Sequence, residues 1–252
     1  MKILNKLSKK VIVILCFSLL ILPQWSCESD GNASPDTGQA GSMARFAVSG
    51  DKLYVVEPSM LQVYDIADPL NPVVGEKIHI GLNMETVFIQ GNSLFIGSQN
   101  GMHIYDISIP SQPAFLSVYD HITSCDPVVV QGNYAYVTLR SGADRRFGQN
   151  LLDVVDVSNL KQPKLVSTKS MLNPHGLAVK DSILIVCEGE YGFKLLNVID
   201  PQEVQAISHI ENLSAYDVII KDSIAIVTGK DGIFQYDFSD PENIELLSQI
   251  TP

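Results

Sequence analysis

"TVFIQGNSLFIG", residues 86–97, contains two short runs of β-branched and aromatic residues on either side of a Gly-Asn pair. Gly tolerates a positive φ and Asn tolerates the left-handed region, so the stretch predicts a tight β-hairpin. Four other stretches share the pattern, and they are "RFAVSGDKLYVV" (45–56), "PVVVQGNYAYVT" (127–138), "GLAVKDSILIVC" (176–187) and "DVIIKDSIAIVT" (217–228). The hairpin therefore belongs to an internal repeat, and the repeat decides the fold.

Two landmarks keep their register through the repeats. The turn residues lie 41, 41, 49 and 41 residues apart, and they are Gly50, Gly91, Gly132, Asp181 and Asp222. A marker residue follows each turn by 15, 15, 24, 16 and 15 positions, and these markers are Asp65, Asp106, Asp156, Asn197 and Asp237. The single long value places an insertion in the third repeat, within residues 140–150. Five copies of one unit follow from this spacing.

Each copy contains four β-type runs, which in the second copy are "TVFIQ", "SLFIGS", "MHIYDI" and "AFLSVYD". Weak alternation within the runs indicates sheets covered on both faces, as in a β-propeller with four strands per blade. The sequence predicts an all-β propeller of five blades over 44–252. The repeats span about 44–80, 85–121, 126–171, 175–210 and 216–250. The order of strands predicts that blade five packs on blade one without an exchanged strand.

The repeats resemble the LVIVD repeat family of bacterial and archaeal cell-surface proteins. "LDVVD" at 152–156 is nearest to the motif that names the family, and "GNYAYVT" (132–138) and "YDISIPSQP" (105–113) match its flanks. The resemblance covers nearly all of 44–250 and implies a β-propeller at the cell surface, without a common reaction. The later copies depart from the pattern, because Val204 and Ile244 replace a proline found in the first three.

Residues 1–26 have the features of an export signal. Four lysines precede the apolar run "VIVILCFSLLIL" (11–22), which at twelve residues is short for a membrane span of about 20. The signal resembles that of bacterial lipoproteins, which implies lipidation of Cys27, although Gln24 stands where that family usually has Leu. Residues 27–43 are rich in Gly, Ser and Asp, and we expect a flexible tether. The predicted location of the protein is the cell envelope, at the outer membrane or cell surface.

Charge limits the partners. The chain has 17 basic and 28 acidic side chains, and removal of the four signal lysines leaves 13 against 28, a net charge of −15. A strongly acidic chain disfavours nucleic acid as a partner. We expect a monomeric domain, held to a membrane by its lipid, with a protein, glycan or small ligand as partner.

The five marker residues have two interpretations. Asp65, Asp106, Asp156 and Asp237 could form a ring of carboxylates for catalysis or metal binding. The sequence favours structural turn anchors instead, because Asn197 fills the same place and an Asp or Asn side chain accepts backbone N–H groups in turns.

Functional candidates lie where the copies differ. Six positions before each turn residue stand Ala44, Glu85, Asp126, His175 and Tyr216, which a propeller brings to one mouth of its channel. The next positions hold Arg45, Thr86, Pro127, Gly176 and Asp217. Glu85, Asp126 and His175 could ligate a divalent metal, since carboxylates and imidazole suit such ions, and the alternative is a solvated rim. No other cofactor is predicted.

The insertion adds a second candidate. Arg140, Arg145 and Arg146 form the densest basic cluster of an acidic chain, and loops on rigid scaffolds often bind partners. The alternative is a surface insertion that the fold tolerates. The residue types give no nucleophile, phosphate-binding or zinc motif. We expect Cys125 and Cys187 to be free, buried thiols, and the alternative is a disulfide between them, which export would permit. The sequence thus favours a non-enzymatic binding scaffold, and the alternative is an envelope enzyme with a metal at the channel mouth.

Overall fold

The computed structural model of the protein describes residues 41–120, 127–140 and 149–251. These residues lie in one compact unit, Thr37–Pro252. In the described part of the chain, no helix is long and apolar enough to cross a membrane.

The described residues form five four-stranded antiparallel sheets, each built from four consecutive strands. We call these sheets blades 1 to 5 in chain order. Blade 1 holds β1 (Phe46–Ser49), β2 (Lys52–Glu57), β3 (Met60–Asp65) and β4 (Val73–His79). Blade 2 holds β5 (Met84–Gln90), β6 (Ser93–Ser98), β7 (Gly101–Asp106) and β8 (Ala114–Asp120). Blade 3 holds β9 (Val128–Gln131), β10 (Tyr134–Leu139), β11 (Leu151–Asp156) and β12 (Lys164–Ser170). Blade 4 holds β13 (Leu177–Lys180), β14 (Ile183–Cys187), β15 (Phe193–Asn197) and β16 (Gln205–Ile210). Blade 5 holds β17 (Asp217–Lys221), β18 (Ile224–Gly229), β19 (Gly232–Asp237) and β20 (Glu245–Ile250).

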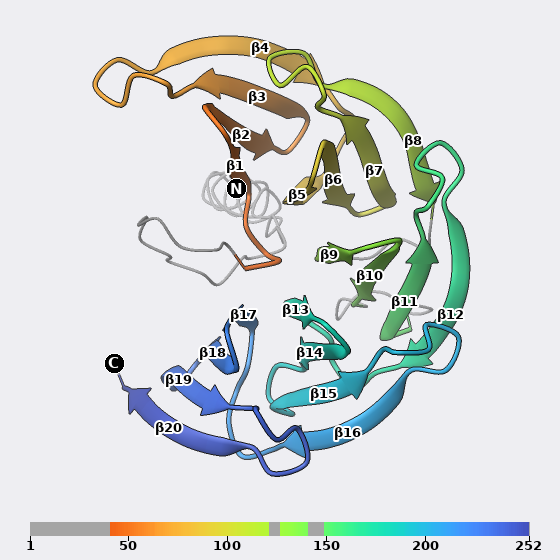
Figure 1. Ribbon diagram of the computed structural model, residues 1–252, viewed down its shortest axis with the longest axis vertical. Helices are drawn as coiled ribbons and strands as arrows, with labels where there is room; N and C mark the ends of the chain where they lie inside the picture. Colours follow the sequence, from red (N-terminus) through yellow and green to blue (C-terminus); the bar gives the residue numbers. More distant parts are fainter. Residues whose placement is uncertain (1–40, 121–126, 141–148, 252) are drawn as a thin grey trace, which may run out of the picture. The chain divides into compact units, whose positions relative to one another are not determined.

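The blades follow one another around a common axis, with the first strand of each blade innermost and the fourth outermost (Figure 1). The predicted hairpin turns explain how each blade starts. All five turn residues have a positive φ, from 52° at Asp181 to 59° at Gly132. Gly and Asp accept this conformation at low cost, which ties the sequence pattern to the local geometry. The all-β class and the division into five four-stranded blades are therefore confirmed.

A register shift recurs between the third and fourth strands of every blade, close before the marker residue. Such a bulge bends the strand and increases its twist. Because all five blades share it, their outer strands curve alike, as the long arcs of β4, β8, β12, β16 and β20 show (Figure 1).

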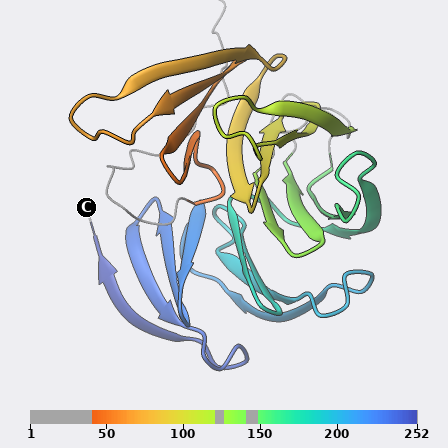
Figure 2. The same ribbon diagram turned by 45° about the horizontal axis from the view of Figure 1, so that its top comes forward.

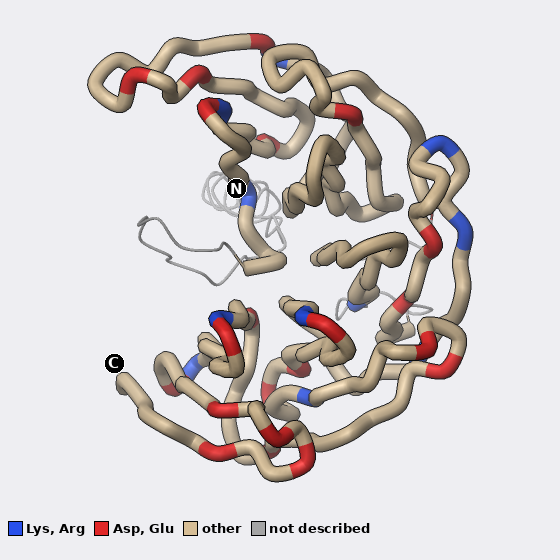
Figure 3. Tube along the Cα trace, in the orientation of Figure 1, with Lys and Arg blue, Asp and Glu red and all other residues tan. Residues whose placement is uncertain are grey.

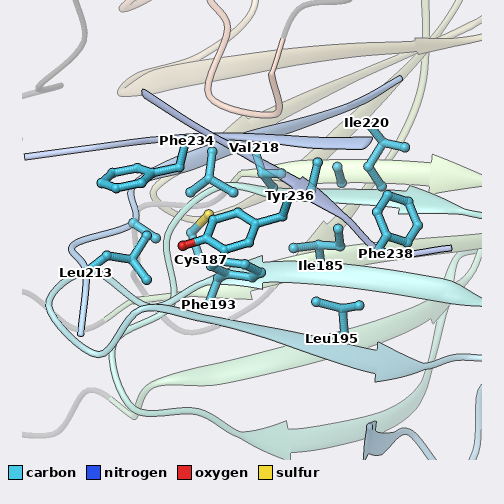
Figure 4. Close-up of a cluster of buried hydrophobic side chains, with 14 residues drawn as sticks. Ile185, Cys187, Phe193, Leu195, Leu213, Val218, Ile220, Phe234, Tyr236 and Phe238 are labelled. Atoms are coloured by element: carbon cyan, nitrogen blue, oxygen red, sulfur yellow. The ribbon is translucent and has the colours of Figure 1, made fainter. Parts of the chain in front are cut away.

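The core consists of hydrophobic clusters between neighbouring blades. Within the described residues, four clusters join blades 1 and 2, 2 and 3, 3 and 4, and 4 and 5. Figure 4 shows the last of these, in which Phe193 of blade 4 meets Tyr236 of blade 5 with ring centroids 5.1 Å apart. Each fully buried aliphatic or aromatic side chain there contributes about 1.5–3 kcal/mol, so the blades hold one another in place.

The sequence predicted that blade 5 packs on blade 1. This prediction is wrong for the described residues. No cluster among the described residues joins the two blades, and an opening separates β17–β20 from β1–β4 (Figures 1 and 2). The prediction of no exchanged strand is correct, because each sheet takes its four strands from consecutive chain. The spacing of repeats fixes the number of blades, but it carries no information on the angle between them.

Candidate functional site

The two ends of the innermost strands define two mouths. We call the end with the turn residues the turn mouth, and the opposite end, where the strands begin, the entry mouth. Of the five predicted entry-mouth residues, the structure describes Ala44, Glu85, His175 and Tyr216, while Asp126 lies outside the described residues. Glu85 Oε1 lies 3.4 Å from Gln99 Nε2, at the outer limit of a hydrogen bond.

His175 is the most enclosed of these side chains. Its Nε2 lies 3.4 Å from Arg140 Nη1 of the preceding blade, and its ring centroid lies 5.2 Å from that of Tyr216 in the following blade. Burial, and secondarily the charge of Arg140, lowers the pKa of His175 to about 3. The imidazole is therefore neutral near pH 7, and its Nε2 accepts from the guanidinium in the tautomer that carries the proton on Nδ1.

Backbone contacts hold His175 in place on both sides. Thr138 Oγ1 donates to the His175 carbonyl at 2.7 Å, and the His175 N–H donates to the Cys187 carbonyl at 2.8 Å. The following residue, Gly176, donates its N–H to the Tyr216 carbonyl at 2.9 Å. Blades 3, 4 and 5 thus meet around one side chain, and the structure brings Arg140, His175 and Tyr216 together.

The metal hypothesis gains no support from the described residues. Among them, no group of three or more His, Cys, Asp and Glu side chains is placed to hold a metal ion. Glu85 and His175 are described, and the group next to the His175 Nε2 is a guanidinium. A cation already beside the imidazole disfavours a second one at that nitrogen.

A second feature of the entry mouth joins the start of the propeller to its last blades. The Asp217 carboxylate, on β17, accepts hydrogen bonds from the backbone N–H groups of Ser42, Met43 and Val218. Ser42 Oγ lies 3.4 Å from Asp217 Oδ1 and accepts from the Leu177 N–H at 2.7 Å. We call this arrangement the Ser42–Asp217 clasp. It docks the segment before β1 on the innermost strands of blades 4 and 5.

Two glycines make room for the clasp. A Cβ built at Gly41 or at Gly176 would lie 2.0 Å from an oxygen of the Asp217 carboxylate. Burial raises the pKa of Asp217 to about 6, and the hydrogen bonds from Val218, Met43 and Ser42 limit that rise. The sequence offered one signal for this contact, since Asp217 is the only acidic residue among the five at its repeat position.

The loop "EGEYG" (188–192), which follows β14, contains a buried charge. Glu188 Oε1 accepts from the Leu172 N–H at 2.7 Å, and its Oε2 lies 2.6 Å from Lys194 Nζ. That contact has the distance of an ion pair but not the angles of a hydrogen bond, so we treat it as an ion pair. The Lys194 charge compensates a carboxylate that would otherwise be costly to bury.

The five marker residues have one geometry in all blades. The side-chain oxygen of each accepts the backbone N–H two residues later, at 2.7–3.0 Å, and the pairs are Asp65 with Ala67, Asp106 with Ser108, Asp156 with Ser158, Asn197 with Ile199 and Asp237 with Ser239. This is an Asx turn, in which the amide of Asn197 serves as well as a carboxylate. Hydrogen bonds to Ser108 lower the pKa of Asp106.

The remaining candidates lie partly outside the description. Arg140 ends the described part before the insertion, and Arg145 and Arg146 lie outside it. Cys187 is a free, fully buried thiol, and burial raises its pKa, whereas Cys125 lies outside the described residues. Acidic residues occur in all five blades, and basic residues are fewer (Figure 3).

Comparison with known proteins identifies the repeat. The LVIVD repeat matches residues 40–78, 83–121 and 124–169, which correspond to blades 1 to 3. No curated protein shows significant sequence similarity to the chain. The departures at Asn197, Val204 and Ile244 lie in the two blades that the repeat does not match.

Similar solved structures support the fold alone. A Lactobacillus plantarum protein matches with a TM-score of 0.67 at 12% identity, covering 80% of this chain and 68% of that one. AztD from Citrobacter koseri matches with a TM-score of 0.59 at 15% identity, covering 81% and 60%. BamB from Moraxella catarrhalis matches with a TM-score of 0.57 at 11% identity, covering 75% and 55%. The chain thus spans 60% of AztD and 55% of BamB.

Proposed function

We propose that this β-propeller with LVIVD repeats is a lipid-anchored protein of the bacterial cell envelope, exposed at the surface, that acts as a binding scaffold without catalysis. The observation that carries the proposal is the division of the repeats. Positions that recur in every blade make turns, bulges and core, whereas the entry mouth brings Arg140, His175 and Tyr216 together from three blades. Residues that a scaffold does not require are the ones available for recognition.

The chemistry of the entry mouth favours binding over catalysis. With a pKa of about 3, His175 is a neutral imidazole near neutral pH and cannot act as a general acid there, and its Nε2 already faces Arg140. Arg140 supplies a positive charge and Tyr216 an aromatic face in an otherwise acidic protein. Together these groups suit an acidic or hydroxyl-rich group of a protein or glycan partner. Arg145 and Arg146 would extend the positive surface.

A photo-crosslinker tests the binding site. Replacing Tyr216 with a photoreactive phenylalanine analogue and irradiating intact cells should give a discrete crosslinked band, since this position lies at the entry mouth. The matched control carries the same analogue at Asn133, which is exposed at the turn mouth. Adding Arg140→Gln should reduce the Tyr216 band about tenfold, as expected for a hot-spot residue. Equal crosslinking from both mouths would show that the entry mouth is not the binding site.

The anchor is tested separately. Lipidation at Cys27 predicts that an alkyne-labelled fatty acid is incorporated into the chain and that Cys27→Ser abolishes the label. Cys16→Ser, inside the apolar run, should leave labelling unchanged. Labelling that survives Cys27→Ser would disprove the anchor and leave the binding proposal standing.

A further inference from the structure

The four contacts between neighbouring blades use the same repeat positions. On the face of a blade that looks toward the preceding blade, which we call the trailing face, the residue four before the turn is always buried. These residues are Val87, Val128, Leu177 and Val218, none more than 3% exposed. On the opposite or leading face, the residue four before the marker is always buried, and these are Leu61, Met102, Leu152 and Phe193, all 0% exposed.

The trailing face of blade 1 and the leading face of blade 5, which border the opening, have apolar residues at the same repeat positions, but no neighbouring blade of the described chain covers them. On the trailing face of blade 1 the equivalent residue is Phe46, which is 45% exposed, and two positions later Val48 is 56% exposed. On the leading face of blade 5 the equivalent residue is Ile233, which is 39% exposed. Phe46 and Ile233 are therefore large apolar side chains at contact positions that are buried in the other four blades. Exposed apolar positions of this kind mark an interaction surface.

Hydrogen bonds between blades also distinguish the two faces, because the leading face supplies the donors and the trailing face the acceptors. At the turn mouth, the residue before the turn donates to the turn carbonyl of the next blade: Gln90 to Gly132 at 2.8 Å, Gln131 to Asp181 at 2.6 Å, and Lys180 to Asp222 at 2.7 Å. The equivalent donor on blade 5 is Lys221, and the equivalent carbonyl on blade 1 belongs to Gly50.

Two of the four outer-strand contacts show the same relation, whereas Ser208 Oγ, the equivalent atom of blade 4, has no hydrogen-bond partner among the described residues. Ser117 donates to the Leu160 carbonyl of the next blade at 2.5 Å, and Ser167 donates to the Pro201 carbonyl at 2.6 Å. The equivalent serine of blade 5 is Ser248, and the equivalent carbonyl of blade 1 belongs to Pro69. The leading face of blade 5 thus has donors, and the trailing face of blade 1 has acceptors, at matching repeat positions.

We propose that a second copy of this chain occupies the opening, with its blade 1 docked on blade 5 of the first copy. The contact would continue the blade-to-blade interface that the chain already forms four times. Because donors and acceptors lie on unlike faces, the association is heterologous, head to tail, rather than a symmetric pairing of like faces. This proposal replaces the expectation of a monomeric domain and does not depend on the binding function proposed above.

Light scattering after size-exclusion chromatography tests the proposal on the full-length Cys27→Ser chain. The expected result is a species of at least twice the monomer mass that dissociates on dilution. Phe46→Asp and Ile233→Asp should each weaken association about tenfold or more, because each puts a charge into an apolar contact. Leu165→Asp, on the exposed outer strand β12, is the matched control and should associate like the parent chain. Circular dichroism spectra and melting curves confirm that the variants are folded.

Mixing the two variants distinguishes head-to-tail from symmetric association. The Phe46→Asp chain keeps an intact blade 5 face, and the Ile233→Asp chain keeps an intact blade 1 face, so a mixture can form one intact contact. A heterodimer should therefore appear in the mixture at concentrations where neither variant associates alone. A parent chain that stays monomeric at every concentration, association unaffected by both substitutions, or no heterodimer on mixing would each overturn the proposal.

Discussion

The two mouths of the propeller differ in how their residues are specified. At the turn mouth every blade repeats one geometry, with a Gly or Asp at positive φ and, in three successive contacts, a donor that reaches the next blade. At the entry mouth the residues and their contacts differ from blade to blade. His175 lies beside Arg140, for example, and Asp217 contacts Ser42. Residues that recur in every blade therefore serve the fold, whereas residues that differ between blades are specific to this chain.

The largest effect should come from pH at the entry mouth. The pKa of Asp217 is raised from 3.8 to about 6, so its contribution to stability is complete at low pH and is lost as pH rises through about 6. The pKa of His175 is lowered from 6.5 to about 3, so its contribution is complete above about 6.5 and is lost as pH falls toward 3. Between about pH 4 and 6 the free energy of unfolding falls with pH because of Asp217 and rises with pH because of His175. Each change amounts to about 1.4 kcal/mol per pH unit.

Two substitutions separate these slopes. In the Asp217→Asn variant only the His175 effect remains, so the chain should lose stability as pH falls. In the His175→Gln variant only the Asp217 effect remains, so the chain should gain stability as pH falls. Their free energies of unfolding, measured in urea, should diverge by about 5 kcal/mol between about pH 6 and pH 4. Parallel pH profiles for the two variants would show that neither group titrates as its burial requires.

The second effect tests the crowding around the clasp. Gly176→Ala places a Cβ 2.0 Å from Asp217 Oδ1 and 2.9 Å from Asp217 Cα, and should lower stability by about 2–3 kcal/mol. Denaturant unfolding gives the value. Combining it with Asp217→Ala, which empties the space, should recover part of the loss. Additive losses in the double variant would contradict a steric conflict with Asp217.

At the turn mouth the expected loss is smaller, because strain there comes from the backbone alone. Gly91 has a φ of 57°, and a Cβ at this position would meet no atom within 4 Å. Gly91→Ala should therefore destabilise by about 1 kcal/mol, the cost of the left-handed conformation. Asn92→Ala, at the neighbouring position without a positive φ, is the control and should cost less. Equal losses at the two positions would argue against strain as the cause.

The smallest effect is expected at a marker residue. Asn197 Oδ1 accepts the Ile199 N–H at 2.9 Å, as the aspartates do in the other blades. Asn197→Asp keeps the acceptor and should change thermal stability by less than about 0.5 kcal/mol, whereas Asn197→Ala should cost about 1 kcal/mol. If Asp destabilises as much as Ala, the position requires the amide itself and the Asx turn does not explain it.

Local sequence predicted the blades well because their determinants are local. A turn residue such as Gly91 and a marker such as Asp106 act on neighbours within a few positions, and their spacing fixes four strands per unit. The clasp joins Ser42 to a partner 175 residues away, and no periodic pattern encodes such a contact. The opening between blades 5 and 1 was missed for a related reason, since it depends on how side chains such as Phe193 and Tyr236 set the angle between blades.

The Ser42–Asp217 clasp also defines how the propeller carries a mechanical load. Tension on the chain before Gly41 reaches blade 1 through β1, but it reaches blades 4 and 5 at the same time through Ser42, which contacts both Leu177 and Asp217. The first and last blades therefore share a pull applied at one terminus, although no hydrophobic cluster joins them in the described chain. The clasp therefore opposes peeling of the propeller from its first strand, because that strand cannot be drawn away until the clasp opens.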